Sequence, residues 1–110
     1  MTVTSTQAGD ALILRVSGRL DGVTSPEFEK TCQQQIKPEV RRVILDLAGV
    51  NYVSSAGLRA VFQASKMARA GGGELRLCGL HGTVKDTMEI SGFYGLFPVY
   101  DSAEAALEPY

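Results

Sequence analysis

The sequence has 110 residues, of which 45% are hydrophobic and 21% are charged, with eleven basic against twelve acidic side chains. This length suits one hydrophobic core, so we expect a single domain over residues 1–110. The net charge of −1 argues against direct binding of nucleic acid, which needs a concentrated excess of Lys and Arg. No apolar run is long enough for a membrane span and no secretory signal opens the chain, so we expect a cytoplasmic protein.

The residues that most often bind metals or act as catalytic bases are few. Cys32 and Cys78 follow no metal-site spacing, which predicts two free thiols, no metal and no cofactor. His81 is the only histidine, and histidine is the most common general base. The composition therefore argues against a hydrolase, and we expect a protein that is not an enzyme.

The first part of the chain predicts a β-hairpin followed by a helix. Apolar residues alternate over residues 11–17, and this strand is expected to pair with residues 3–7 across a Gly-Asp turn, ending at Gly18. Thr24 is expected to cap a helix, with Glu27 at the capping-box distance. That helix ends before Pro38 and buries every fourth residue, namely Phe28, Cys32 and Ile36.

A central strand and the longest helix come next. Residues 43–47 form a nearly continuous apolar run, typical of a strand covered on both faces. The following helix extends to about Ala70, where three glycines stop it. Its basic residues Arg59, Lys66 and Arg69 are expected on one face. The opposite, buried face is expected to contain Leu58, Val61, Phe62, Ser65 and Ala68.

The last part of the chain repeats the alternation of strand and helix. Residues 74–78 and 96–100 predict strands, Thr83 predicts the cap of a helix that ends at Gly92, and a final helix runs through Leu107. Helices that connect successive strands imply parallel pairing. We therefore expect an α/β fold: a mixed, mostly parallel sheet of about five strands, with the N-terminal antiparallel hairpin at its edge and about four flanking helices.

Ser54 and Ser55 stand where a loop enters the longest helix. Unpaired backbone N–H groups and the positive end of the helix dipole favour an anion there, so a phosphate on either serine would be partly stabilised. The simpler interpretation is that one serine only caps the helix. A nucleophile elbow is disfavoured, because the Gly-x-Ser-x-Gly pattern is absent.

Two aspartates are further candidates for a functional role. Asp21 lies in a strand-to-helix loop, where its carboxylate could contact a partner or a metal, although a turn or cap role is the commoner explanation. Asp46 lies in an apolar strand, where an unpaired carboxylate would be costly. We expect Asp46 to accept backbone N–H groups near a loop.

Several segments in order resemble the STAS domain: residues 18–21, 43–47, 53–58, 72–75 and 90–93. The whole chain is similar to stand-alone bacterial anti-sigma factor antagonists. The resemblance implies a switch in which the antagonist binds an anti-sigma factor that is also a serine kinase. Binding of the antagonist to the anti-sigma factor releases a sigma factor. Phosphorylation of the antagonist ends this binding, and a serine phosphatase removes the phosphate and resets the cycle.

Position by position, the resemblance places Ser55 at the phosphoacceptor serine. It implies a partner-binding surface made of Asp21, Ser54, Ser55, Ala56, Gly57 and Arg59. Ser54 replaces the Asp that usually precedes the phosphoacceptor, and Ala56 replaces the Ser or Thr that usually follows it. These departures leave one alternative open: a STAS scaffold without phosphorylation, in a signalling complex or as the soluble subunit of a lipid-transport ABC system.

Overall fold

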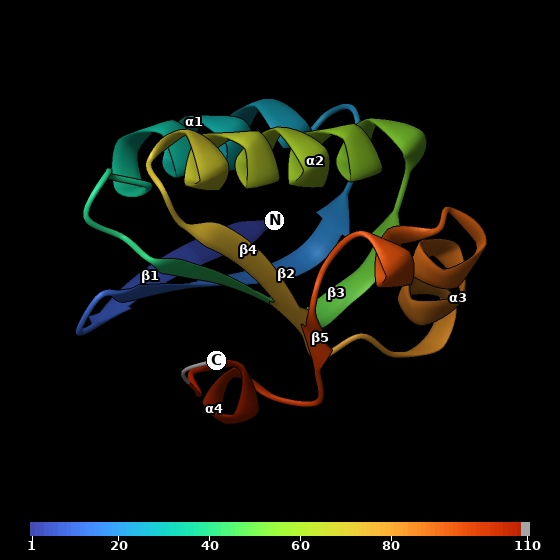
Figure 1. The fold of residues 1–110 in the computed structure, drawn as a ribbon. Coiled ribbons are helices and arrows are strands. Elements are labelled where there is room, and N and C mark those ends of the chain that lie inside the picture. The colour runs from blue at the N-terminus through green and yellow to red at the C-terminus, as the bar shows by residue number, and fades with distance from the viewer. Residues whose placement is uncertain (109–110) are drawn as a thin grey trace.

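A computed structural model describes residues 1–108 and contains one five-stranded mixed sheet, in the order β1-β2-β3-β4-β5 (Figure 1). The strands are β1 (Thr2–Ala8), β2 (Ala11–Leu20), β3 (Arg42–Val53), β4 (Glu74–Cys78) and β5 (Val99–Tyr100). β1 pairs antiparallel with β2, and every other pairing is parallel. The expected α/β fold, with an antiparallel hairpin at the edge of a mostly parallel sheet, is confirmed.

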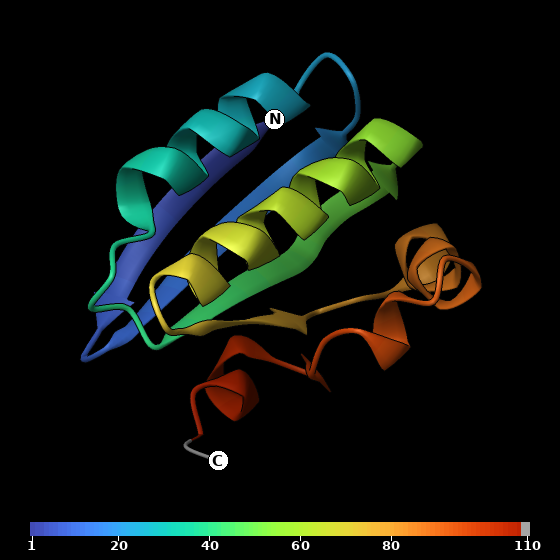
Figure 2. The same cartoon turned by 45° about the horizontal axis from the view of Figure 1, so that its top comes forward.

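Helices cover the sheet unequally on its two faces (Figure 2). α1 (Ser25–Gln35) and α2 (Ser55–Ala70) lie side by side on one face, and their apolar residues complete the main core. The short α4 (Ala103–Ala106) packs on the opposite face, against residues of β2, β3 and β4. α3 (Gly82–Ile90) and a 3₁₀ turn (Phe93–Gly95) lie between β4 and β5 in the chain. Residues 1–108 therefore leave much of the second face of β1, β2 and β3 uncovered.

β2 and β3 are longer than their apolar patterns predict. β2 continues past Gly18 to Leu20, and β3 continues past Leu47 to Val53. The two strands stay paired through two register shifts, with Leu20 opposite Val53. In the β3 extension two exposed residues separate successive buried ones, so the strict alternation by which a half-buried strand is predicted is absent.

The last strand is shorter than predicted, and two predicted caps are absent. β5 contains only Val99 and Tyr100, because the chain before it forms a 3₁₀ turn and a loop. Thr24 precedes α1 without a capping hydrogen bond from its side chain. α3 begins at Gly82 instead of after Thr83, whose hydroxyl donates to the carbonyl oxygen of Asn51. The Thr24 hydroxyl donates instead to the carbonyl oxygen of Arg19 at 2.8 Å within the loop before α1, whereas the Thr83 contact joins residues distant in the sequence.

A buried arginine, which the sequence did not reveal, holds α4 in place. Arg76 in β4 is 1% exposed. Its Nε donates to the Glu74 carboxylate at 2.6 Å, and its Nη1 donates to the carbonyl oxygen of Ala106 at 2.8 Å. The guanidinium thus satisfies carbonyl groups at the C-terminal end of α4, where no intrahelical donor is available.

Candidate functional site

The loop after β2 and the loop after β3 meet at one end of the sheet. The two strands are parallel neighbours, so their C-terminal ends lie together. The Ser54 backbone N–H donates to the carbonyl oxygen of Leu20 at 3.0 Å. A Cβ placed on Gly22 would lie 3.9 Å from the Cβ of Ala56. Asp21 and the segment from Ser54 to Ala56, which are far apart in the sequence, therefore form one continuous surface.

The two serines have different roles in this surface. Ser54 has an extended backbone and is the N-cap of α2, with its Oγ accepting the Gly57 N–H at 3.2 Å. Ser55 is the first helical residue and is exposed. Within residues 1–108 its hydroxyl forms no hydrogen bond, so it is available for chemistry. The capping role suggested by the sequence belongs to Ser54, and the accessible hydroxyl is that of Ser55.

Gly57 lets α2 approach the end of β2 very closely. An added Cβ at this position would lie 2.3 Å from the carbonyl oxygen of Leu20 and 3.0 Å from Cγ1 of Val53. No side chain fits in that space, so a glycine is required although glycine weakens a helix. Gly57 is buried, so its predicted place on a partner-binding surface is not an exposed one, and what it sets is the distance between α2 and β2.

Asp21 organises the loop after β2. Its Oδ1 accepts the backbone N–H groups of Val23 at 3.0 Å and Thr24 at 3.1 Å. Its Oδ2 lies 3.4 Å from Nε of Arg19. The Thr24 N–H, with smaller contributions from Val23 and Arg19, holds the pKa of the Asp21 carboxyl below its ordinary value against an opposing effect of burial. Asp21 is thus a turn-forming residue, and its contact with a partner stays a prediction.

The surface includes apolar residues that were not predicted from the sequence. Val23, in the same loop as Asp21, is 88% exposed. Tyr52 is 40% exposed, and the Arg19 guanidinium lies 4.2 Å from the centre of its ring. Phe62 is also 40% exposed, so its assignment to the buried face of α2 was wrong. The one sequence signal that could have revealed Val23 was an apolar residue directly after the turn-forming pair Asp21-Gly22.

The remaining predicted partner-binding residues differ in accessibility. Arg59 is exposed one turn after Ser55, and it forms no ion pair with any residue between 1 and 108. Ser54 and Ala56 are partly buried. Ser55 and Arg59 are therefore the two most accessible polar groups among the residues that the resemblance assigned to partner binding.

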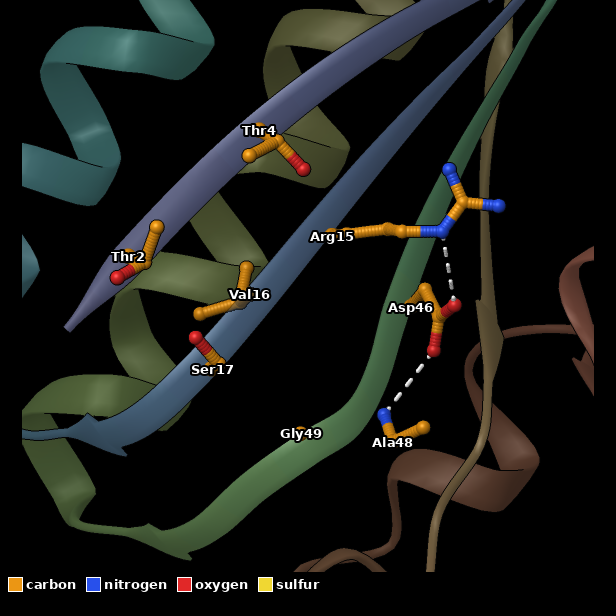
Figure 3. Close-up of a pocket in the computed structure, with 8 residues that line it drawn as sticks. All are labelled: Thr2, Thr4, Arg15, Val16, Ser17, Asp46, Ala48 and Gly49. Atoms are coloured by element: carbon orange, nitrogen blue, oxygen red, sulfur yellow. Dashed lines mark hydrogen bonds and ion pairs between the residues drawn. The ribbon is translucent and has the colours of Figure 1, made fainter.

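Asp46 lies at a different place, on the uncovered face of the sheet (Figure 3). It pairs with Nε of Arg15 at 3.6 Å and accepts the Ala48 N–H at 3.0 Å, so the expected backbone donor is present. The expected place was wrong, because Asp46 lies inside β3 and not near a loop. A pocket of about 260 Å³ surrounds this pair and is also lined by Thr2, Thr4, Val16, Ser17 and Gly49. The pocket shares no residue with the surface around Ser55.

The other potentially reactive side chains are either hydrogen-bonded or buried. Burial raises the pKa of both the Cys32 and Cys78 thiols to about 12, so neither is a thiolate at neutral pH. Nε2 of His81 lies 2.8 Å from the carbonyl oxygen of Ala48. Over residues 1–108 there is no cluster of three metal-ligating side chains. In the same range no helix has the length and apolar character to cross a membrane.

Comparisons with a family model and with known proteins indicate the same family. A family model described as STAS domain matches residues 2–106. The chain is 40% identical over 106 residues to BtrV of Bordetella bronchiseptica, named an anti-sigma factor antagonist, and the alignment covers 96% of this chain and 91% of BtrV.

Solved structures share the fold at lower identity. An anti-sigma factor antagonist from Mycobacterium paratuberculosis has a TM-score of 0.86 at 21% identity, over 96% of this chain and 90% of that chain. The Bacillus cell fate determinant SpoIIAA in its phosphorylated form has a TM-score of 0.71 at 17% identity, over 94% and 96% of the two chains.

Proposed function

Because this chain belongs to the STAS domain family, we propose that it is an anti-sigma factor antagonist controlled by phosphorylation of Ser55. The antagonist function is supported by the 40% identity to BtrV, which extends over nearly the full length of both chains. The control by phosphate is supported by the accessibility of the Ser55 hydroxyl beside the capped N-terminus of α2. That observation carries the proposal.

The position of Ser55 suits a reversible switch. A phosphate there would add about −1.5 to −2 charges to a surface proposed for docking, which disrupts binding through repulsion and desolvation. The same phosphate would sit at the positive end of the α2 dipole, so the domain tolerates it without unfolding. The charge therefore changes what binds and leaves the fold intact.

The proposed partners are an anti-sigma factor with serine kinase activity and a serine phosphatase that removes the phosphate. Since sigma factors act in transcription, we propose that the protein acts in the cytoplasm. We further propose that the chain itself is not an enzyme. The side chain of His81 is directed to the Ala48 carbonyl, and among residues 1–108 no hydrogen bond links it to Ser55.

Phosphorylation is tested by incubating the protein with serine-kinase anti-sigma factors and ATP, followed by intact mass measurement. Wild-type protein is expected to gain one phosphoryl group. Ser55→Ala is expected to gain none. Ser54→Ala is the matched control, because it removes the neighbouring hydroxyl and keeps the proposed acceptor. Phosphorylation of Ser55→Ala to the wild-type extent would refute Ser55 as the acceptor.

Binding gives an independent measurement. Ser55→Glu is expected to weaken binding to the anti-sigma factor while its circular dichroism spectrum stays unchanged. Undiminished binding of this variant would contradict the switch. Stable binding of wild-type protein with no phosphoryl transfer from any tested kinase would instead support the scaffold function that Ser54 and Ala56 left open.

A further inference from the structure

The exposed side of α2 presents a straight row of residues that begins at Ser55. Apart from Ala70 at its end, every exposed residue of α2 belongs to this row. Successive members are separated by four, three, four and three positions, so they fall within an arc of about 80° on the helix. We refer to this row as the α2 stripe, and it consists of Ser55, Arg59, Phe62, Lys66 and Arg69.

The α2 stripe concentrates positive charge. α2 contains three basic residues and no Asp or Glu, although the chain as a whole has a net charge of −1. None of these three basic side chains forms an ion pair with a residue in the described range of 1–108. Solvated helix faces commonly alternate charge signs in pairs one turn apart. The α2 stripe lacks such pairs, so the positive charge from Arg59 to Arg69 is left uncompensated along about three helical turns.

An aromatic ring lies in the middle of these charges. Phe62 is 40% exposed, and the Lys66 ammonium lies 5.1 Å from the centre of its ring. Aromatic residues and arginine are the residue types enriched at the centres of protein interfaces. An exposed phenyl group between Arg59 and Lys66 therefore has the composition of a docking anchor.

We propose that the α2 stripe is the docking surface for an acidic face of the anti-sigma factor, with Phe62 entering an apolar pocket there. This inference rests on the proposed function. An acidic partner is the chemistry that fits both states of the switch. Before phosphorylation the basic residues attract it, and afterwards a dianion at the first position of the stripe repels it. A nucleic acid fits less well, because three cations supply few of the phosphate contacts that duplex binding uses.

The test compares charge reversals on two neighbouring helices. Lys66→Glu lies on the α2 stripe, and Lys30→Glu makes the same change at an exposed position of α1. Affinity is measured by titration calorimetry, at low and high salt, for the anti-sigma factor that binds wild-type protein. Lys66→Glu is expected to weaken binding about tenfold at low salt and to reduce its salt dependence, whereas Lys30→Glu stays near wild type. Phe62→Ala is expected to weaken binding about tenfold at both salt concentrations.

The possible outcomes distinguish failure of the α2 stripe as a docking surface from failure of the proposed antagonist function. Circular dichroism and urea unfolding first establish that the exposed substitutions leave the fold unchanged. If Lys66→Glu and Lys30→Glu bind with equal affinity while wild-type protein binds normally, the docking role of the α2 stripe is overturned and the antagonist function is not. Failure of wild-type protein to bind any anti-sigma factor would overturn the proposed function and this inference with it. Tight binding of a labelled DNA duplex, lost in Lys66→Glu, would also overturn the assignment of a protein partner.

Discussion

Replacing Gly57 with alanine tests how the site is held together. The added Cβ would lie 2.3 Å from the Leu20 carbonyl oxygen, a separation far below van der Waals contact. Relief requires the first turn of α2 to move away from the end of β2. That movement stretches the hydrogen bond from the Ser54 N–H to Leu20, and it displaces Ser55 relative to the loop that contains Asp21.

Three effects determine how much Gly57→Ala changes the free energy of unfolding. Overpacking costs about 2 kcal/mol in typical cases, and the stretched backbone hydrogen bond costs about 1 kcal/mol. Alanine recovers about 1 kcal/mol through its higher helix propensity. Gly57→Ala is therefore expected to destabilise the protein by about 2 kcal/mol, which for a domain of this size lowers Tm by about 8 °C.

The measurement is urea unfolding followed by circular dichroism, together with thermal melts. Gly95→Ala is the matched control, because a Cβ at Gly95 meets no atom within 4 Å. It is expected to change stability by less than about 0.5 kcal/mol. A Gly57→Ala protein as stable as wild type would show that the approach of α2 to β2 does not constrain this position, and would refute the reasoning.

Two further predictions concern the same loops. Ser54→Ala removes the cap of α2 and is expected to cost about 1 kcal/mol of unfolding free energy, whereas Ser55→Ala costs less than about 0.5 kcal/mol. Equal losses in urea unfolding would contradict the division of roles between the two serines. The second prediction concerns pH. The pKa of Asp21 is lowered by folding, so its carboxylate stabilises the fold above its unperturbed value of 3.8 and this stabilisation is lost as pH falls through the folded value. Urea midpoints are therefore expected to show Asp21→Asn less stable than wild type at neutral pH, with the gap closing in acid. A gap that is constant with pH would contradict the role of the charge.

The sequence identified most residues of the candidate site, but it did not show the structural role of each residue. The segment from Ser54 to Gly57 was identified from its resemblance to the STAS family, together with Asp21. Which serine caps the helix depends on backbone angles at the start of α2, and these were not evident from the spacing of the residues. The exposure of Val23 and Phe62 was missed, because hydrophobic type alone predicts burial.

The sequence by itself determined the alternation of strands and helices, because the spacing of apolar residues follows the geometry of each element. It also determined the parallel connectivity, since helices between strands permit little else. Only the tertiary structure decided that Leu20 and Ser54 bond across two strands, that Arg76 could be buried, and that Phe62 lies on the exposed side of α2. These features depend on contacts between residues distant in the sequence, and the energy of such contacts is absent from any local pattern.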